Sequence, residues 1–209
     1  MRKVIKVELY KGKTMRVDFS EGEPEFVSSE VCFDCGVSAG REFSDEEWAD
    51  VIYKNDLRRA KERALYLLDY RDYSYSELFK KLSENYDEQL CYDVCDRLAE
   101  LGVINDRRYA EQLARRYVEV KKFGLRRARQ EMRQKGLGAE LIDEALEKYS
   151  ETVTERIVEL INKKYIRKLE AENGEEKVKN ALARLGYSYA DINAAFEEFY
   201  SGLEEENDG

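Results

Sequence analysis

A spacing of 50 residues recurs along this chain, and no other feature constrains its fold as strongly. Placed in register, the coinciding residues are Ser74, Gly124 and Gly174, then Leu78, Ala128 and Val178, then Leu82, Met132 and Leu182. Gly136 and Gly186 also coincide, each just past the end of a predicted helix, where a glycine can adopt the left-handed conformation that closes the last turn. The pattern predicts one structural unit copied along the chain.

Each copy is predicted to contain three helices, because apolar residues recur at helical spacing and the only proline is Pro24. In the second copy, Tyr109, Leu113, Tyr117 and Val120 fall on one stripe and are expected to be core. The predicted helices cover residues 57–70, 74–85 and 87–102, then 106–121, 124–135 and 139–149, then 151–170, 174–185 and 188–201. Units this small bury little surface alone, so we expect them to stack in an elongated, bowed array.

The first forty residues have a different character. VIKVELY and TMRVDF are rich in β-branched and aromatic residues and flank Lys11-Gly12-Lys13, which predicts a β-hairpin. Residues 25–27 are a candidate third strand, and residues 28–40 are expected to be irregular. Ser44 and Glu47 have the spacing of a capping box, so a short helix over 44–54 is predicted to follow.

The predicted fold is therefore mainly α, with tandem three-helix repeats and a small N-terminal β-hairpin appendage. The predicted domains are 1–56 for the hairpin and short helix, 57–105, 106–150 and 151–201 for the repeats, and 202–209 for an acidic disordered tail.

The composition excludes several classes of function. The chain has no histidine, which rules out serine-histidine triads, HExxH zinc sites and imidazole bases. We identify no catalytic residues, no cofactor site and no metal site. No segment approaches the roughly 20 apolar residues that span a bilayer, so we expect a cytoplasmic protein without a membrane partner, and a monomer.

Four cysteines, Cys32, Cys35, Cys91 and Cys95, leave two alternatives to inert thiols. Together they could supply four thiolates to zinc, and the Cys32/Cys35 pair alone could be redox-active. Cys91 and Cys95 are one helical turn apart on the same face as Leu98, so buried packing explains them without a metal. Reduced, inert thiols are the favoured interpretation.

Positive charge is concentrated in the second repeat. Residues 107–135 contain eleven basic residues and three acidic ones, a net charge of +8, in a chain of net charge -9. The rest of the chain therefore carries -17. Three glutamates cannot neutralise eleven cations, so a contact with an anionic surface is favoured over a merely solvated helix face.

The arginines of residues 124–135 are expected to face outward together. On a helix, Leu125, Ala128 and Met132 share one stripe, while Arg126, Arg129 and Arg133 share the stripe beside it. Packing of the first stripe would leave the arginines exposed. Tyr109, Tyr117 and Phe123 lie among the cations; their spacing indicates core before base stacking, and Phe123, near a helix end, is the most open to exposure.

The partner suggested by charge alone is either nucleic acid or an acidic groove of another protein. Two functions remain open at this point: a sequence-independent DNA-binding protein, and a helical scaffold that binds another acidic protein.

The stretches ALYLLDYRDYSYSELFKKL, LAELGVINDRRYAEQLARRYVEVKKFGLRRARQEMRQKGL and IDEALEKY resemble the RecX regulatory proteins. The strongest local match is residues 102–106 with Tyr109-Ala110, followed by Gly124 and the basic helix up to Gly136. The resemblance covers about residues 57–200 and is distributed over the repeats.

The resemblance implies tandem three-helix repeats that dock in the groove of the RecA filament on DNA and inhibit ATP hydrolysis and strand exchange, with possible direct contact to DNA. It places the chain in homologous recombination, DNA repair and the SOS response. Carried onto this sequence, the expected contact residues are Arg115, Arg116, Lys121, Lys122, Arg126, Arg127, Arg129 and Arg133.

Overall fold

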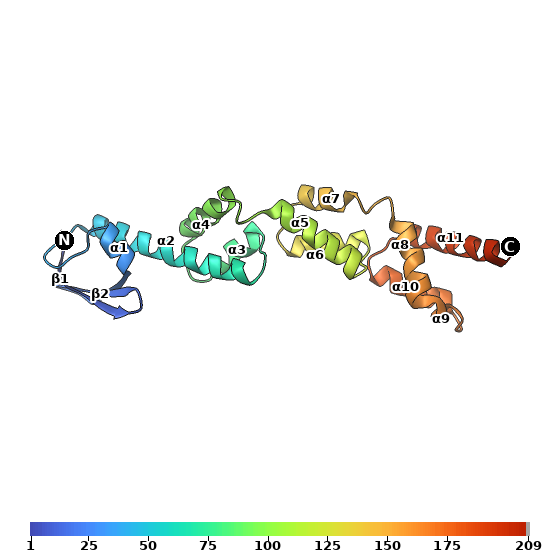
Figure 1. Cartoon of the computed structure of the whole chain (residues 1–209), viewed down its shortest axis with the longest axis horizontal. Coiled ribbons are helices and arrows are strands. Elements are labelled where there is room, and N and C mark those ends of the chain that lie inside the picture. Colours follow the sequence, from blue (N-terminus) through green and yellow to red (C-terminus); the bar gives the residue numbers. More distant parts are fainter. Residues whose placement is uncertain (208–209) are drawn as a thin grey trace. The chain divides into compact units, whose positions relative to one another are not determined.

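The structure is a computed structural model that describes residues 1–207, with side chains as far as residue 203. The chain divides into two compact units. The first contains residues 1–71 and 78–103, and the second contains residues 72–77 together with residues 104 onward. Figure 1 shows the helices and strands of both units. The predicted fold class is confirmed: the chain is mainly α, with tandem three-helix repeats and a small N-terminal antiparallel sheet.

The N-terminal part of the first unit is an antiparallel sheet of strand order β3-β2-β1-β4. Its elements are β1 Arg2–Lys11, β2 Thr14–Phe19, β3 Glu25–Ser28, α1 Ser29–Asp34 and β4 Glu42–Phe43. The predicted hairpin turns at Gly12, whose φ of +58° suits a glycine. The third strand is confirmed. The expectation of an irregular segment over 28–40 is wrong in part, because α1 buries Val31 and Cys32 against this sheet.

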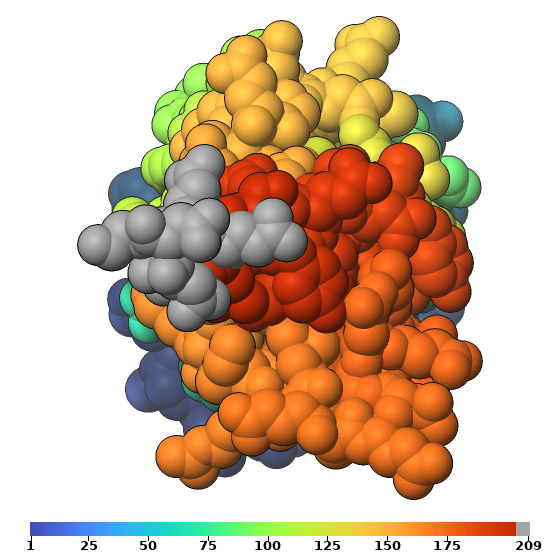
Figure 2. Space-filling view, turned by 90° about the vertical axis from the view of Figure 1, so that its right-hand side faces the viewer, coloured from blue at the N-terminus to red at the C-terminus, as the bar shows by residue number. Residues whose placement is uncertain are grey.

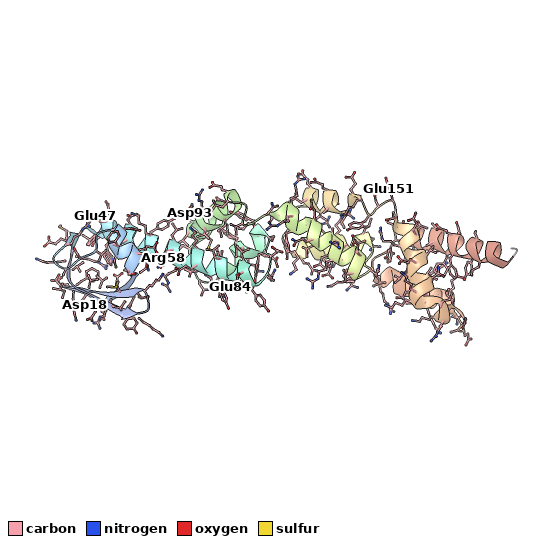
Figure 3. The ribbon with its side chains drawn as sticks, in the orientation of Figure 1. Asp18, Glu47, Arg58, Glu84, Asp93 and Glu151 are labelled. Carbon is pink, nitrogen blue, oxygen red and sulfur yellow. The ribbon has the colours of Figure 1, made fainter. Side chains whose placement is uncertain are left out.

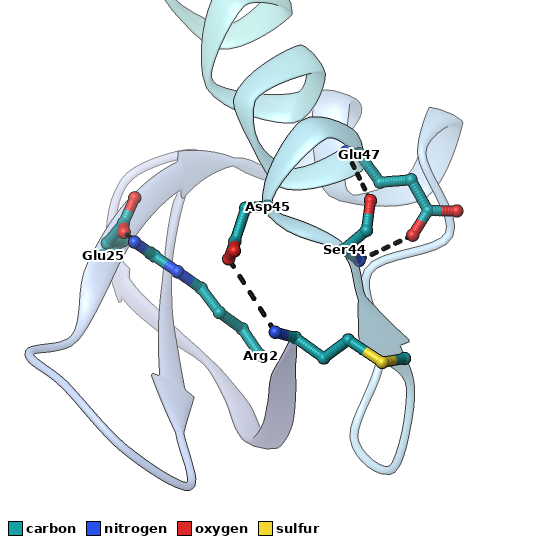
Figure 4. Close-up of polar contacts among 6 residues, drawn as sticks. Arg2, Glu25, Ser44, Asp45 and Glu47 are labelled. Atoms are coloured by element: carbon teal, nitrogen blue, oxygen red, sulfur yellow. Dashed lines mark hydrogen bonds and ion pairs between the residues drawn. The ribbon is translucent and has the colours of Figure 1, made fainter.

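One helix, α2 Asp45–Tyr70, follows the sheet. Its start is the predicted capping box: the Glu47 amide donates to Ser44 Oγ at 3.0 Å, and the Ser44 amide donates to Glu47 Oε2 at 2.7 Å (Figure 4). Trp48 lies in the first turns and packs edge-on against Phe19 and Phe43, with ring centroids 4.7 and 5.3 Å apart. The cap and the tryptophan together fix the helix to the sheet.

The prediction of two separate helices over 44–54 and 57–70 is wrong, because α2 is continuous over 26 residues. No proline or glycine interrupts it. Asn55, which lies between the two predicted helices, is buried, and its Oδ1 accepts a hydrogen bond from the Ser28 amide at 2.9 Å. Arg58, one turn later and labelled in Figure 3, pairs with Glu30 at 2.8 Å and with Glu62 at 2.9 Å.

The first unit ends with the remaining helices of the first repeat, α3 Tyr75–Leu82 and α4 Glu88–Glu100. Residues 75–77 of α3 belong to the second unit. Leu90, Val94 and Leu98 form the buried face of α4. The apolar spacing noted in the sequence therefore marks the packed face of this helix, as expected for an amphipathic helix.

The second unit contains two further copies of the repeat. The elements of the first are α5 Asp106–Arg115, a π-helical turn η1 Arg116–Val120, α6 Leu125–Gln134 and α7 Ala139–Glu147. The elements of the second are α8 Val153–Leu160, a π-helical turn η2 Ile161–Tyr165, α9 Ile166–Leu169, α10 Gly174–Arg184 and α11 Tyr189–Asn207. Figure 2 shows α11 in red with orange residues of the preceding helices beside it.

The C-terminal helix is longer than predicted. The prediction that it ends at residue 201 is wrong, because α11 continues to Asn207. The residues after Gly202 include three glutamates, which are good helix formers, and no proline. The prediction of a disordered tail over 202–209 is therefore wrong as far as residue 207, and residues 208–209 lie outside the described residues.

The predicted core stripe of the second repeat is confirmed for Tyr109, Leu113 and Tyr117, which are all buried. It is wrong for Val120, which is 74% exposed, whereas Val118 is fully buried. The π-helical turn η1 accounts for this difference, because its wider turn rotates the residues that follow out of the 3.6-residue register.

Within the second unit, the start of one middle helix contacts the end of the next. Ser74 Oγ donates to the carbonyl oxygen of Lys135 at 2.5 Å. Fifty residues further on in both partners, the Gly124 amide donates to the carbonyl oxygen of Leu185 at 2.8 Å. The same junction is thus built twice, once with a serine hydroxyl and once with a glycine backbone, and the second junction lies beside the predicted basic residues.

Candidate anion-binding surface

The eight predicted contact residues lie on consecutive elements of the second repeat, from the end of α5 through η1 to α6. We call them the basic surface; its members are Arg115, Arg116, Lys121, Lys122, Arg126, Arg127, Arg129 and Arg133. The packed face of α6 buries Ala128 and Met132 in the core of this repeat, as the stripe of apolar residues predicted. The opposite side of the helix therefore carries the arginines.

Three arginines of the basic surface are held by carboxylates of the same repeat. Arg129 Nε donates to Asp143 Oδ1 of α7 at 2.9 Å, and its side chain is 35% exposed. Arg115 lies 3.3 Å from Glu119, and Arg127 lies 3.6 Å from Glu131. These pairs are exposed enough to be weak, but they reduce the charge that each arginine presents to a partner.

Arg116, Arg126 and Arg133 are exposed, and their side chains make no ion pair or hydrogen bond with the residues that the structure describes. The predicted stripe of Arg126, Arg129 and Arg133 is therefore divided: its two outer members are free, and the middle one is engaged with α7. The free arginines carry most of the charge available to an anionic partner.

The two lysines between η1 and α6 are held in different ways, Lys121 by aromatic rings and Lys122 by its backbone. Lys121 Nζ lies 5.1 Å from the Tyr117 ring centroid and 5.4 Å from that of Phe123, within the range of cation–π contacts. Lys122 has a φ of +56°, and its carbonyl oxygen accepts a hydrogen bond from the Tyr187 hydroxyl at 3.1 Å. The turn is thereby tied to the third repeat.

The aromatic residues among the cations are core. Tyr109 and Tyr117 are buried, as predicted. Phe123, which was expected to be more exposed than the two tyrosines, is buried as well: it is 8% exposed, the same as Tyr109. It packs against Tyr117, and the guanidinium carbon of Arg127 lies 4.0 Å from the centroid of its ring. Burial raises the pKa of Tyr117. The rings therefore support the basic surface and do not form a platform for bases.

Sequence reasoning missed Arg184, which lies in the last turn of α10 in the third repeat. Its carbonyl oxygen accepts a hydrogen bond from Arg127 Nη1 at 3.2 Å, and its side chain is exposed. The 50-residue register could have indicated its location, because the equivalent residue is Gln134 at the end of α6. The register does not show that the C-terminal end of α10 lies beside the first turns of α6.

The cysteines are free thiols. Cys91 and Cys95 are buried in α4, which confirms the packing prediction. Burial raises the pKa of Cys95 to about 12, and burial together with the neighbouring Cys35 raises that of Cys32 to about 11. Both shifts disfavour thiolates. Among residues 1–207 no three His, Cys, Asp or Glu side chains are grouped so that they could hold a metal ion, and no helix is long and apolar enough to cross a membrane.

Comparison with known proteins gives a consistent result. The family model for the first three-helix domain of RecX matches residues 60–98, and that for the second matches residues 105–146. The regulatory protein RecX of Clostridioides difficile is 26% identical over 191 residues, which cover 89% of this chain and 90% of that protein. That of Clostridium acetobutylicum is 27% identical, covering 95% and 96%.

Solved structures agree. A crystal structure of regulatory protein RecX superposes with a TM-score of 0.71 at 24% identity, covering 94% of this chain and all of that one. The crystal structure of RecX from Lactobacillus salivarius superposes with a TM-score of 0.64 at 26% identity, covering 70% of this chain and 97% of that one.

Proposed function

Because this chain belongs to the RecX family of regulatory proteins, we propose that it binds the filament of RecA on DNA and inhibits ATP hydrolysis and strand exchange. The protein would act in the cytoplasm, as a monomer and without catalysis of its own. The basic surface would be the part that attracts the filament.

The observation that carries this proposal is the set of free arginines, Arg116, Arg126 and Arg133, on a repeat of net charge +4 that lies between two repeats of net charge -2 each. Residues 107–135 carry a net +8 while the rest of the chain carries -17. Extended naked DNA would meet repulsion from the acidic parts, since exposed charges interact over about 10 Å at 0.1 M salt. A protein–DNA filament, which presents protein surface as well as phosphates, suits such a mixed distribution better.

Inhibition follows if the bound protein favours one arrangement of neighbouring recombinase subunits. A ligand that binds one arrangement more tightly shifts the population toward it, and turnover that requires the subunits to move is slowed. This mechanism needs contacts alone and no reactive group.

The direct test is the ATPase activity of RecA on single-stranded DNA, with and without this protein. We expect inhibition by the wild type and loss of inhibition in the triple variant Arg116→Glu, Arg126→Glu, Arg133→Glu. A matched control reverses three exposed cations of the third repeat, Lys164, Arg167 and Lys168, and should still inhibit. Equal inhibition by both folded triple variants would remove the basic surface from the mechanism.

The second candidate function is sequence-independent binding to DNA itself, and the same free arginines favour it. Contact of three cations with single-stranded DNA predicts a log-log salt slope of about -2. Binding of that strength without RecA would support this candidate, whereas weak binding with a shallow slope would favour the filament.

A further inference from the structure

A polar groove of about 340 Å³ lies at the junction between the second and third repeats. One wall is α6 and the other is the C-terminal end of α10. Its lining includes Arg126, Arg127, Gln130 and Glu131 from the first wall and Arg184 and Gly186 from the second. The groove therefore exists only where the two repeats are stacked.

A close contact at Gly186 shapes this groove. A Cβ atom on Gly186 would lie 2.4 Å from the Cβ of Arg127, so the second wall approaches α6 with bare backbone. Arg127 is fixed at the base: its Nη1 donates to the Arg184 carbonyl at 3.2 Å, and its guanidinium carbon lies 4.0 Å from the centroid of the Phe123 ring. The groove is thus a preorganised feature of the junction.

The groove is strongly cationic. Three arginines line it against one acid, Glu131, which already lies 3.6 Å from Arg127. Arg126 and Arg184 are exposed, and neither side chain has an ion-pair or hydrogen-bond partner in the described part of the chain. Two guanidinium groups from different repeats are therefore left for an external anion, with the Gln130 amide as a further donor.

We propose that this groove binds phosphate groups of a nucleic-acid backbone, with Arg126 and Arg184 as the contacting residues and Arg127 as a positioning residue. A guanidinium group offers a planar fork of donors that matches two phosphate oxygens. A nucleic-acid strand presents a charge at every nucleotide, so it can reach the groove and the free Arg116 and Arg133 together, whatever its sequence. The inference rests on the second candidate function proposed above, direct binding to nucleic acid, and it applies to a free strand as well as to the DNA of a filament.

The test measures binding of a dye-labelled oligo(dT) by fluorescence anisotropy over a range of salt concentrations. Arg184→Gln removes the charge and keeps a polar side chain, whereas Arg167→Gln removes another exposed cation, one of α9 that does not line the groove. We expect Arg184→Gln to bind roughly 3- to 10-fold more weakly, with a slope shallower by about 0.7. Arg167→Gln should match the wild type.

Identical slopes for wild type and Arg184→Gln would overturn the proposal. Thymidine monophosphate provides a second arm: if it displaces the oligonucleotide at equal nucleotide concentration, the groove binds a free nucleotide and the nucleic-acid assignment fails. RecA ATPase is measured on the same variants. If the wild type inhibits RecA and Arg184→Gln binds DNA as the wild type does, the groove proposal fails and the proposed function stands. If the wild type binds DNA through Arg184 but does not inhibit RecA, the groove proposal stands and the proposed inhibition of RecA fails.

Discussion

Gly124 and Gly186 bring two backbone segments into direct contact: a Cβ atom on Gly124 would lie 2.4 Å from the carbonyl carbon and oxygen of Gly186. The Gly124 amide also donates to the Leu185 carbonyl. The second and third repeats therefore meet through backbone atoms, and only hydrogen fits at this position. This contact also sets the spacing of the groove between α6 and α10.

Gly124→Ala is therefore expected to lower the free energy of unfolding by about 2 kcal/mol, because backbone atoms cannot move aside as a flexible side chain can. Gly138→Ala is the matched control: Gly138 has a φ of -68° and open space around its Cβ position. Because Gly138 is the N-cap of α7, Gly138→Ala should lower the free energy of unfolding by less than about 1 kcal/mol. Urea titrations followed by circular dichroism compare the two; equal costs would contradict the close contact.

Arg156→Met is expected to stabilise the protein. Nε and Nη2 of Arg156 are buried and lack a hydrogen-bond partner among the described residues, while Nη1 donates to Thr152 Oγ1 at 2.5 Å. Unsatisfied buried donors are costly, and methionine fills a similar volume without them, so we expect a gain of about 1 kcal/mol. Thermal and urea unfolding measure the change. A loss of that size would show that the guanidinium group is satisfied after all.

The repeat could be predicted because its signals are local. Gly136 and Gly186 do take positive φ values, +74° and +93°, just after their helices, as their place in the 50-residue register indicated. The Ser44 cap and the buried face of α4 also followed from short-range spacing. Helix propensity and apolar periodicity act within a few turns, and one sequence carries that information.

Features that depend on tertiary contacts could not be predicted. The buried Asn55 accepts a hydrogen bond from the Ser28 amide, 27 residues earlier in the chain, and no local pattern indicates this contact. Arg129 and Arg126 look alike in the sequence, yet Asp143 on α7 engages only Arg129. The location of Arg184 beside α6 likewise depends on how the repeats stack. The sequence therefore identified the residues of the basic surface, but it did not show which of them are paired and which are free.

The division of the arginine stripe predicts unequal effects of substitution. Arg126→Gln and Arg133→Gln should each weaken inhibition of the RecA ATPase several-fold, because their side chains are free to meet a partner. Arg129→Gln should change inhibition little and lower the free energy of unfolding by less than about 1 kcal/mol, as expected for an exposed ion pair. Dose–response curves of inhibition and urea titrations distinguish the two effects. A larger loss of inhibition with Arg129→Gln than with Arg126→Gln would contradict this division.

Asp106 at the start of α5 gives a pH-dependent prediction. Burial raises the pKa of this carboxyl group and Glu77 adds to the rise, although the hydrogen bond that Oδ1 accepts from the Tyr75 amide, at 2.9 Å, acts against it. A pKa that is higher in the folded than in the unfolded state means that ionisation of Asp106 destabilises the fold. The contribution of Asp106 to the free energy of unfolding therefore rises as the pH falls through the folded pKa.

Asp106→Asn keeps an acceptor for the Tyr75 amide and cannot ionise. The variant should therefore be more stable than the wild type at neutral pH, and its advantage should shrink as the pH falls toward the ordinary range of an aspartate. Urea titrations of both proteins from pH 7 to pH 4 at constant ionic strength give the difference in unfolding free energy. An advantage that grows as the pH falls would mean that the folded pKa of Asp106 is lowered, and that the hydrogen bond from Tyr75 outweighs burial.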